Sequence, residues 1–247
     1  MMRLGMMLLF VASAAVAAPE GSKRPVARAG ASVTAVPAQA SIETVAFTPG
    51  AVSLRPALRP RSIANQALAR RAERRKGQLC GDPDIQGDVV GFVPGRINGC
   101  GIAEAVRVKS VAGVSLSQPA TLDCSAAKAL KSWTVKSAKK NLSNVGGGLA
   151  SYRVAAHYAC RTRNNQPGAR ISEHGRGKAI DISGFTLRDG STLTVLKDWR
   201  ASGRALQRMH KDACGTFGTV LGPNSDRFHQ DHFHFDTARH RGGAFCR

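Results

Sequence analysis

The sequence predicts an α+β domain in which helices flank a largely antiparallel sheet and disulfides staple the chain. Segments with the composition of short strands outnumber helical ones, and they show no regular strand–helix–strand alternation. The turn sequence Arg188-Asp189-Gly190 separates two of these segments at the spacing of a hairpin. Six cysteines, all between residue 80 and the C-terminus, suit up to three disulfides in an exported protein.

The expected elements follow from local patterns along the chain. Apolar residues recur at every third or fourth position of residues 120–141, which predicts an amphipathic helix that Gly146-Gly147-Gly148 ends. A second helix is expected over residues 201–214. Strands are expected over residues 152–160, 179–185, 192–196, 218–221 and 232–237.

The cysteines are expected to cross-link the fold. Their spacing contains no Cys-X-X-Cys pair, which argues against a cysteine-ligated zinc or a thioredoxin-like redox site. The sequence alone does not fix their connectivity. We favour pairing in chain order, Cys80 with Cys100, Cys124 with Cys160 and Cys214 with Cys246.

The first 79 residues differ in composition from the rest. Residues 1–18 contain a basic residue, a short apolar run and a small-residue end, which is typical of a signal peptide. Residues 19–79 are basic and rich in Ala, Pro and Arg, so we expect a disordered linker before a domain over residues 80–247. Within this linker, residues 63–76 could form a short basic helix, but we favour a solvated tail.

The net charge of +20 limits the choice of partners. The mature chain has no second apolar stretch of about 20 residues, so we expect no membrane span and a periplasmic or secreted protein. In that location the anionic partner would be peptidoglycan or another polymer of the cell envelope. No nucleic-acid partner is expected, because aromatic residues make up only 5% of the chain and no nucleic-acid-binding motif is present.

The C-terminal strand carries an alternating pattern that indicates a polar site. Alternate residues of a strand share a face, so His232, His234 and Asp236 would point one way. Phe233 and Phe235 would point the other way, into the core. A metal and a polar cross-strand pair are both compatible with this pattern.

An upstream segment supplies further donors. His174 lies in a glycine-rich turn, and Asp181 stands between Ile180 and Ile182, so that the carboxylate faces away from the core. A buried carboxylate is costly unless it is paired or binds a metal. Catalytic zinc usually has three protein ligands and an open position, and His174, Asp181 and His234 make such a set. The alternative is that His174 caps a turn and Asp181 forms an ordinary salt bridge.

These residues carry a family resemblance. The pattern Ser-X-His-X-X-Gly-X-Ala-X-Asp, here residues 172–181, followed by His232-X-His234, resembles the LAS zinc peptidases. The spacing of His229, His232 and His234 is similar to that of the penicillin-insensitive murein endopeptidase. The whole of residues 80–246 is most similar to the bacterial extensin-like C-terminal domain family. The matching phrases are residues 158–161, 172–174, 179–182, 220–223 and 231–236.

The resemblance implies a fold of the hedgehog and D-Ala-D-Ala peptidase type and a role for each residue. His174, Asp181 and His234 would bind Zn²⁺. His232 would be the general base, and His229 would orient it or contact the substrate. LAS enzymes often have a glutamate where this chain has Asp231, so Asp231 is the alternative base. The resemblance also assigns oxyanion stabilisation to Arg161, although a surface arginine is an equally good interpretation.

The sequence thus predicts an exported zinc-dependent peptidase that hydrolyses amide bonds of peptidoglycan stem peptides or cross-links. The alternative is a zinc-containing domain that binds or strengthens the cell wall without catalysis. A serine or cysteine hydrolase fits poorly, because no Gly-X-Ser-X-Gly is present and the cysteines are expected to be bridged.

Overall fold

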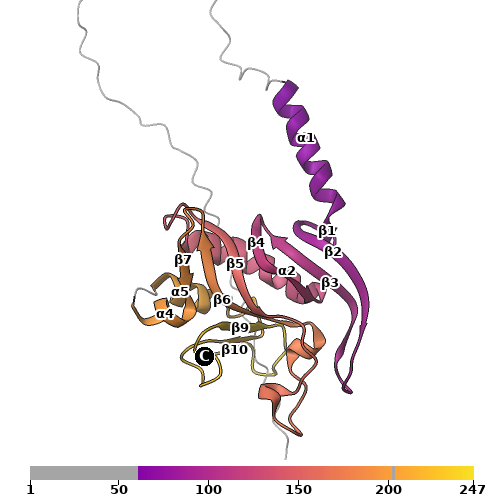
Figure 1. Ribbon diagram of the computed structural model, residues 1–247, viewed down its shortest axis with the longest axis vertical. Helices are drawn as coiled ribbons and strands as arrows, with labels where there is room; N and C mark the ends of the chain where they lie inside the picture. The colour runs from indigo at the N-terminus through magenta and orange to yellow at the C-terminus, as the bar shows by residue number, and fades with distance from the viewer. Residues whose placement is uncertain (1–60, 202–203) are drawn as a thin grey trace, which may run out of the picture. The chain divides into compact units, whose positions relative to one another are not determined.

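The computed structural model describes residues 61–201 and 204–247. The predicted signal peptide and the first part of the predicted linker lie outside these residues. Ten strands form one sheet in the order β1-β2-β3-β4-β5-β6-β9-β8-β10, with β7 beside β6 (Figure 1). β4 pairs with β5 and β8 pairs with β10 in parallel, and the other pairs are antiparallel. The predicted α+β class with a largely antiparallel sheet is confirmed.

The elements have the following bounds. The strands are β1 (Gln78–Leu79), β2 (Asp82–Pro94), β3 (Gly101–Val111), β4 (Val114–Leu122), β5 (Leu149–Ala156), β6 (Ala179–Leu187), β7 (Thr192–Thr194), β8 (Thr219–Leu221), β9 (Phe233–Asp236) and β10 (Phe245–Cys246). The helices are α1 (Arg61–Lys76), α2 (Cys124–Trp133), α3 (Lys139–Asn141), α4 (Val195–Ala201) and α5 (Arg204–Ala213). Shorter turns are the π-helical η1 (Thr134–Ala138) and the 3-10 turns η2 (Arg163–Asn165) and η3 (Glu173–Arg176). None of the helices in the described residues is long and apolar enough to span a membrane.

The end of the predicted linker has regular structure. α1 and β1 both precede residue 80, where we placed the domain boundary, and Leu79 is buried. The side chain of Gln86 donates to the carbonyl of Arg74, whose guanidinium also pairs with Asp84. The short basic helix that the sequence left as an alternative for residues 63–76 is therefore present as α1. Their side chains are nevertheless solvated, since residues 62–76 are exposed.

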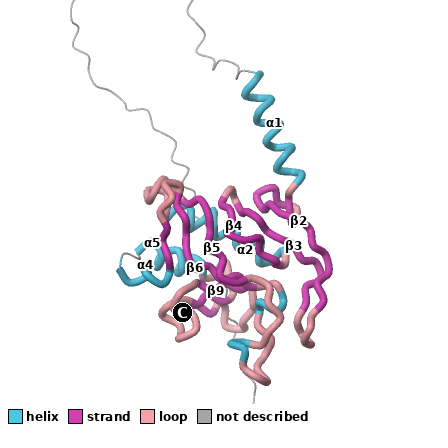
Figure 2. Tube along the Cα trace, in the orientation of Figure 1, coloured by secondary structure: helices cyan, strands magenta, loops and turns pink. Residues whose placement is uncertain are grey.

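The helix expected over residues 120–141 begins later than predicted. Residues 120–122 complete β4, and Asp123 then caps α2 by accepting a hydrogen bond from the Ala126 amide at 2.8 Å. The helical path continues through η1 and α3 to Asn141 (Figure 2). All three glycines at residues 146–148 have positive φ, which explains why the helix cannot continue there.

Most of the other predicted elements occur at shifted bounds. β5 ends at Ala156 and not at residue 160, and α5 lies inside the predicted second helix. The strand expected over residues 192–196 is cut short because α4 begins at Val195. The β2–β3–β4 meander was not predicted. It lies in residues 82–122, where the sequence patterns predicted no strand.

An aromatic core joins the helices to the sheet. Trp133 of α2 packs edge-on against Phe235 of β9 with ring centroids 4.9 Å apart, and its indole donates to the Met209 carbonyl of α5 at 2.8 Å. Phe217 stacks on the same Phe235 at 4.8 Å. This core fixes β9 from one side and leaves its other side available to the site.

The disulfides differ from the predicted pairing in two of three bridges. The structure pairs Cys80 with Cys124 and Cys100 with Cys160, whereas Cys214 pairs with Cys246 as expected. Pairing Cys80 with Cys100 is impossible because the whole of β2 separates them, roughly 40 Å of strand at about 3.3 Å per residue. A disulfide tolerates a Cα separation of only about 4.4–6.8 Å.

Candidate metal centre

The β6–β9 pair places two of the predicted ligands opposite each other. Asp181 of β6 is the cross-strand partner of His234 of β9, and both side chains leave the same face of the sheet. Their neighbours Ile180, Ile182, Phe233 and Phe235 are fully buried in the core on the opposite face. The predicted alternation of polar and apolar faces is therefore confirmed for both strands.

A tight turn delivers the third predicted ligand. His174 is the second residue of η3, whose cap is Ser172, and the turn ends at Gly177 with a φ of 68°. A side chain at Gly177 would approach Ile102 Cδ1 to 2.3 Å, and one at Gly175 would approach Cys100 Sγ to 2.9 Å. Glycine is thus required at both positions for close packing under the turn.

The three predicted ligands converge. His174 Nε2 lies 3.2 Å from His234 Nδ1 and 3.2 Å from Asp181 Oδ2, and His234 Nδ1 lies 2.9 Å from Asp181 Oδ1. Tetrahedral zinc with bonds of 2.0–2.1 Å keeps its ligand atoms about 3.3 Å apart. The donor atoms are therefore already near the separations that one ion would impose.

The hydrogen bonds on the outer ring nitrogens orient both imidazoles. His174 Nδ1 donates to the backbone carbonyl of His157 at 2.7 Å, so its Nε2 presents a lone pair to the centre. His234 Nε2 donates to Asp236 Oδ2 at 3.0 Å, which turns Nδ1 towards Asp181. Lone pairs and a carboxylate at this distance require a proton or a cation between them. The donor set therefore fits a divalent metal ion with a carboxylate and a carbonyl behind its histidines.

The electrostatics of the cluster favour positive charge. Burial would lower the pKa of His234, but hydrogen bonds to Asp181 and Asp236 raise it to about 9. Burial would raise the pKa of Asp181, yet its hydrogen bonds with His174 and His234 hold it well below its usual range. Two carboxylates around a buried imidazole thus attract a proton, and they attract a metal ion that carries more positive charge more strongly.

A cleft of about 740 Å³ opens over the three side chains and includes the predicted catalytic residues. His232 precedes β9 and places Nε2 at 3.6 Å from Asp181 Oδ2. Its Nδ1 lies 2.8 Å from Asp231 Oδ1, and the Asp231 side chain is 64% exposed. Asp231 is therefore on the far side of the His232 ring from the three ligands. This geometry gives His232 access to the site and Asp231 an orienting position.

The partner of His229 was not predicted from the sequence. His229 lines the cleft beside His232, with ring centroids 5.2 Å apart, and its Nδ1 lies 2.7 Å from Asp226 Oδ1. Burial lowers the pKa of His229 despite this hydrogen bond, so the ring is neutral near pH 7. The only signal for Asp226 in the sequence is its position three residues before a histidine, which alone is common.

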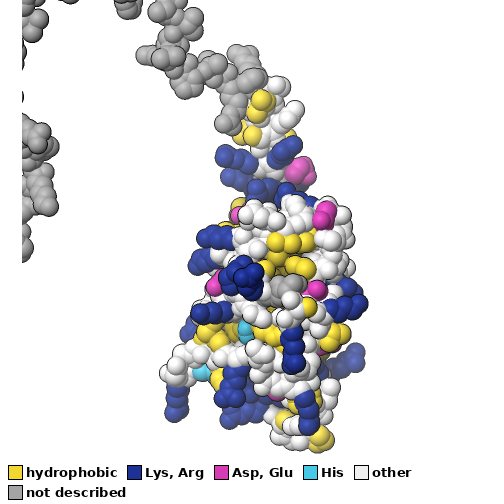
Figure 3. All heavy atoms as spheres, turned by 90° about the vertical axis from the view of Figure 1, so that its left-hand side faces the viewer, with side chains coloured by type: hydrophobic (Ala, Val, Ile, Leu, Met, Phe, Trp, Pro, Cys, Tyr) yellow, Lys and Arg dark blue, Asp and Glu magenta, His cyan; other side chains and the backbone are white. Residues whose placement is uncertain are grey.

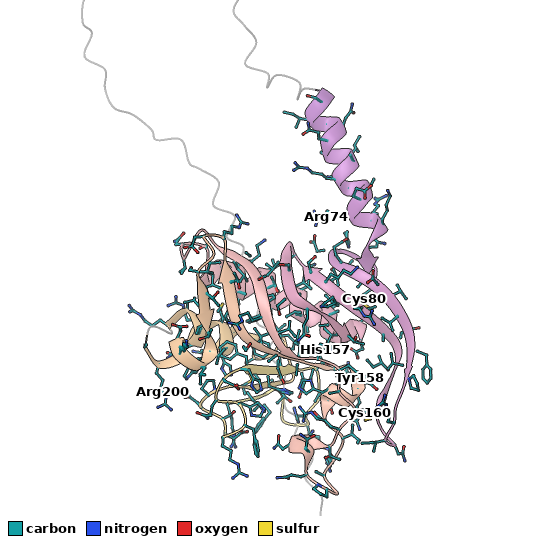
Figure 4. The ribbon with its side chains drawn as sticks, viewed as in Figure 1. Arg74, Cys80, His157, Tyr158, Cys160 and Arg200 are labelled. Atoms are coloured by element: carbon teal, nitrogen blue, oxygen red, sulfur yellow. A yellow bond between two sulfur atoms is a disulfide. The ribbon has the colours of Figure 1, made fainter. Side chains whose placement is uncertain are left out.

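Arg161 also lines the cleft. It follows Cys160, and its carbonyl accepts a hydrogen bond from the Ser172 amide at 3.0 Å, next to the His174 turn. Figure 4 shows His157, Tyr158 and Cys160 between the end of β5 and the β2–β3 hairpin. The Cys100–Cys160 bridge thus holds the segment that supplies both the His157 carbonyl and Arg161.

The larger, C-terminal part of the chain matches a known protein family. Residues 92–247, more than half of the chain, match the family described as Extensin-like protein C-terminus. The chain belongs to this family. No curated protein and no solved structure matches the chain. The extensin-like domain therefore contains the whole of the candidate metal centre.

Proposed function

We propose that this extensin-like protein is an exported, zinc-dependent peptidase that hydrolyses amide bonds of peptidoglycan stem peptides or cross-links. One observation carries the proposal. Two imidazole nitrogens and one carboxylate converge within 3.2 Å of one another at the base of an open cleft, with further histidines beside them. The motif resemblance to LAS zinc peptidases supports the same reaction class.

His174, Asp181 and His234 would hold the ion. Zn²⁺ in such a site supplies Lewis-acid chemistry and makes a water molecule reactive at neutral pH. His232 is the proposed general base, because its Nε2 faces the three ligands while Nδ1 is held by Asp231. It would take a proton from the attacking water and return it to the leaving amine.

The other cleft residues have positioning roles. The neutral His229, held by Asp226, would contact the substrate or fix the ring of His232. The guanidinium of Arg161 would stabilise the negative charge that develops on the carbonyl oxygen. The net charge of +20 would concentrate the protein on an anionic envelope polymer, and salt would weaken that attraction.

Mass spectrometry of muropeptides tests the proposal. Zinc-loaded protein should release new peptide ends from purified peptidoglycan, and chelator-stripped protein should release none. His232→Ala should reduce the rate by roughly 10²–10⁴-fold while zinc content stays close to that of the wild type. A zinc-loaded wild type that cleaves no peptidoglycan would instead favour a wall-binding domain in which the metal serves stability.

Asp231→Asn separates the two candidate bases. An orienting role predicts a rate loss of roughly tenfold, because the amide oxygen can still accept from His232 Nδ1. A loss as large as that of His232→Ala would assign the proton transfer to Asp231.

A further inference from the structure

A second depression in the surface adjoins the metal-centre cleft. It has a volume of about 1100 Å³ and shares Arg163, Glu173 and His240 with that cleft. We call it the basic groove because arginine and lysine side chains outnumber acidic ones in its lining. These side chains are Arg163, Arg170, Arg176, Lys178 and Arg239.

The acidic residues of the groove are already engaged. Glu173 is buried and pairs with Arg176 at 3.1 Å, and Asp123 is occupied in capping α2. Within residues 61–201 and 204–247, the side chains of Arg163, Arg170, Lys178 and Arg239 form no ion pair and donate no hydrogen bond. The groove therefore has unbalanced positive charge that an anionic ligand would neutralise.

Lys178 links the groove to the strand that carries Asp181. It immediately precedes β6, and its carbonyl accepts from the Thr237 amide just after β9. Asp181 follows three residues later, so strand alternation turns the two side chains to opposite faces of the sheet. The groove therefore meets the cleft where Arg163, Glu173 and His240 line both. A ligand that extends from the metal centre would reach the groove past these residues.

We propose that the basic groove binds the carboxylates of an acidic peptide whose scissile bond lies in the adjoining cleft, at the metal centre. This inference deepens the proposed function and rests on it for the position of the bond. It assigns substrate selection to Arg170, Lys178 and Arg239. The substrate class is an acidic peptide with free carboxylates, and amidation of those carboxylates would remove the contacts.

The chain has a net charge of +20, so the test needs a matched control. In Figure 3 lysine and arginine side chains are spread over the visible face and far exceed the acidic ones. The control pair is Lys197→Gln with Arg200→Gln on α4, which removes the same charge from residues that line neither depression. Figure 4 shows Arg200 at the outer edge of the domain.

Fluorescence anisotropy of a labelled peptide measures the contacts. The probe is a hexapeptide with two glutamates, compared with its diglutamine counterpart, and every protein carries His232→Ala so that the probe is not consumed. Arg170→Gln with Arg239→Gln should weaken glutamate-probe binding by about fivefold to tenfold, the size expected of two exposed ion pairs, and flatten its salt dependence. The control pair should change it by less than about twofold. The diglutamine probe should bind weakly to all proteins.

Three results would overturn the inference. Equal losses for the groove and control pairs would assign binding to net charge. Equal binding of both probes would show that carboxylates are not recognised. Displacement of the glutamate probe by inorganic polyphosphate at a far lower concentration than by unlabelled peptide would make the groove a phosphate site. The measurement is repeated on zinc-free protein, so a failure of the proposed catalysis does not affect the groove result.

Discussion

The two faces of the β6–β9 pair are both buried, but they are stabilised in different ways. On one face, Ile180, Ile182, Phe233 and Phe235 have no exposed surface and pack among aromatic rings. On the other face, Asp181, His234 and Asp236 retain only 4–8% exposure and are joined by hydrogen bonds of 2.9–3.0 Å.

This difference separates the source of stability from the source of chemistry. The hydrophobic effect is non-directional, so the aromatic face fixes where the strands lie through buried area and close packing. Buried polar groups must each find a partner, so the polar face requires defined ring tautomers and a central positive charge. Substitutions on the first face should therefore change unfolding, and those on the second should change metal binding.

The largest effect is expected from Phe235→Ala on the aromatic face. Removing a fully buried phenylalanine should lower the free energy of unfolding by about 3–5 kcal/mol. Urea denaturation followed by tryptophan fluorescence measures it, and Phe245→Ala, at a side chain that is 42% exposed, is the control. Zinc affinity of the folded fraction should change little. A matching loss of zinc would show that the two faces are not separable.

On the polar face, Asp181→Asn should abolish most zinc binding. Structural zinc contributes about 10–16 kcal/mol over four ligands, so loss of one charged ligand should weaken binding by roughly a hundredfold to a thousandfold. Competition with a chromogenic chelator measures the affinity. Asp189→Asn in the exposed turn before β7 provides a control with the same chemical change. Wild-type affinity in Asp181→Asn would exclude this carboxylate as a ligand.

A smaller effect is expected from Asp236, which hydrogen-bonds to the proposed ligand His234. Asp236→Ala removes the acceptor of His234 Nε2–H and should weaken zinc binding by about 10- to 100-fold without removing a ligand. Asp236→Asn should recover part of the loss, because its carbonyl oxygen still accepts this hydrogen bond. Equal losses in both variants would point to charge rather than ring orientation.

The smallest effect concerns a polar residue on the aromatic side. His210 is buried beside Trp199 and Phe233, and its Nε2 has no hydrogen-bond partner in the described part of the chain. Burial lowers the pKa of His210 below that of the unfolded chain. At His210 the unfolded state therefore takes up a proton first as the pH falls below about 6.5, and this one group lowers the stability there by at most about 1.4 kcal/mol per pH unit.

Urea denaturation of zinc-free protein between pH 7.5 and 5 checks this sign. His210→Leu should lose less stability than the wild type over the acidic part of that range and should match its slope above pH 7. A His210→Leu variant with an unchanged pH dependence would show that other groups cause the acid sensitivity.

The polar site could be predicted from the sequence better than the surrounding loops, strands and disulfides. Alternation along β9 and the position of Asp181 between two isoleucines depend only on strand geometry, so these predictions were confirmed. The partner of His229 could not be predicted, because Asp226 reaches it through an irregular loop whose path no periodic pattern encodes.

The β2–β3–β4 meander and two of the disulfides were not predicted for a related reason. β2 and β3 contain several exposed or half-exposed apolar residues and register shifts, so they lack the clean alternation that identifies a strand. Because these strands were not predicted, cysteines that are neighbours in the sequence were expected to be close in space. The long hairpin instead takes Cys100 to Cys160, far along the chain.

The Cys100–Cys160 bridge has a consequence for when the candidate metal centre can form. Cys100 Sγ lies directly beneath the turn that carries His174, and Cys160 follows the carbonyl that orients the same ring. In a compartment that keeps thiols reduced, this clamp would be missing and the turn would be free to move. The ligand geometry would then depend on the redox state of the compartment in which the chain folds.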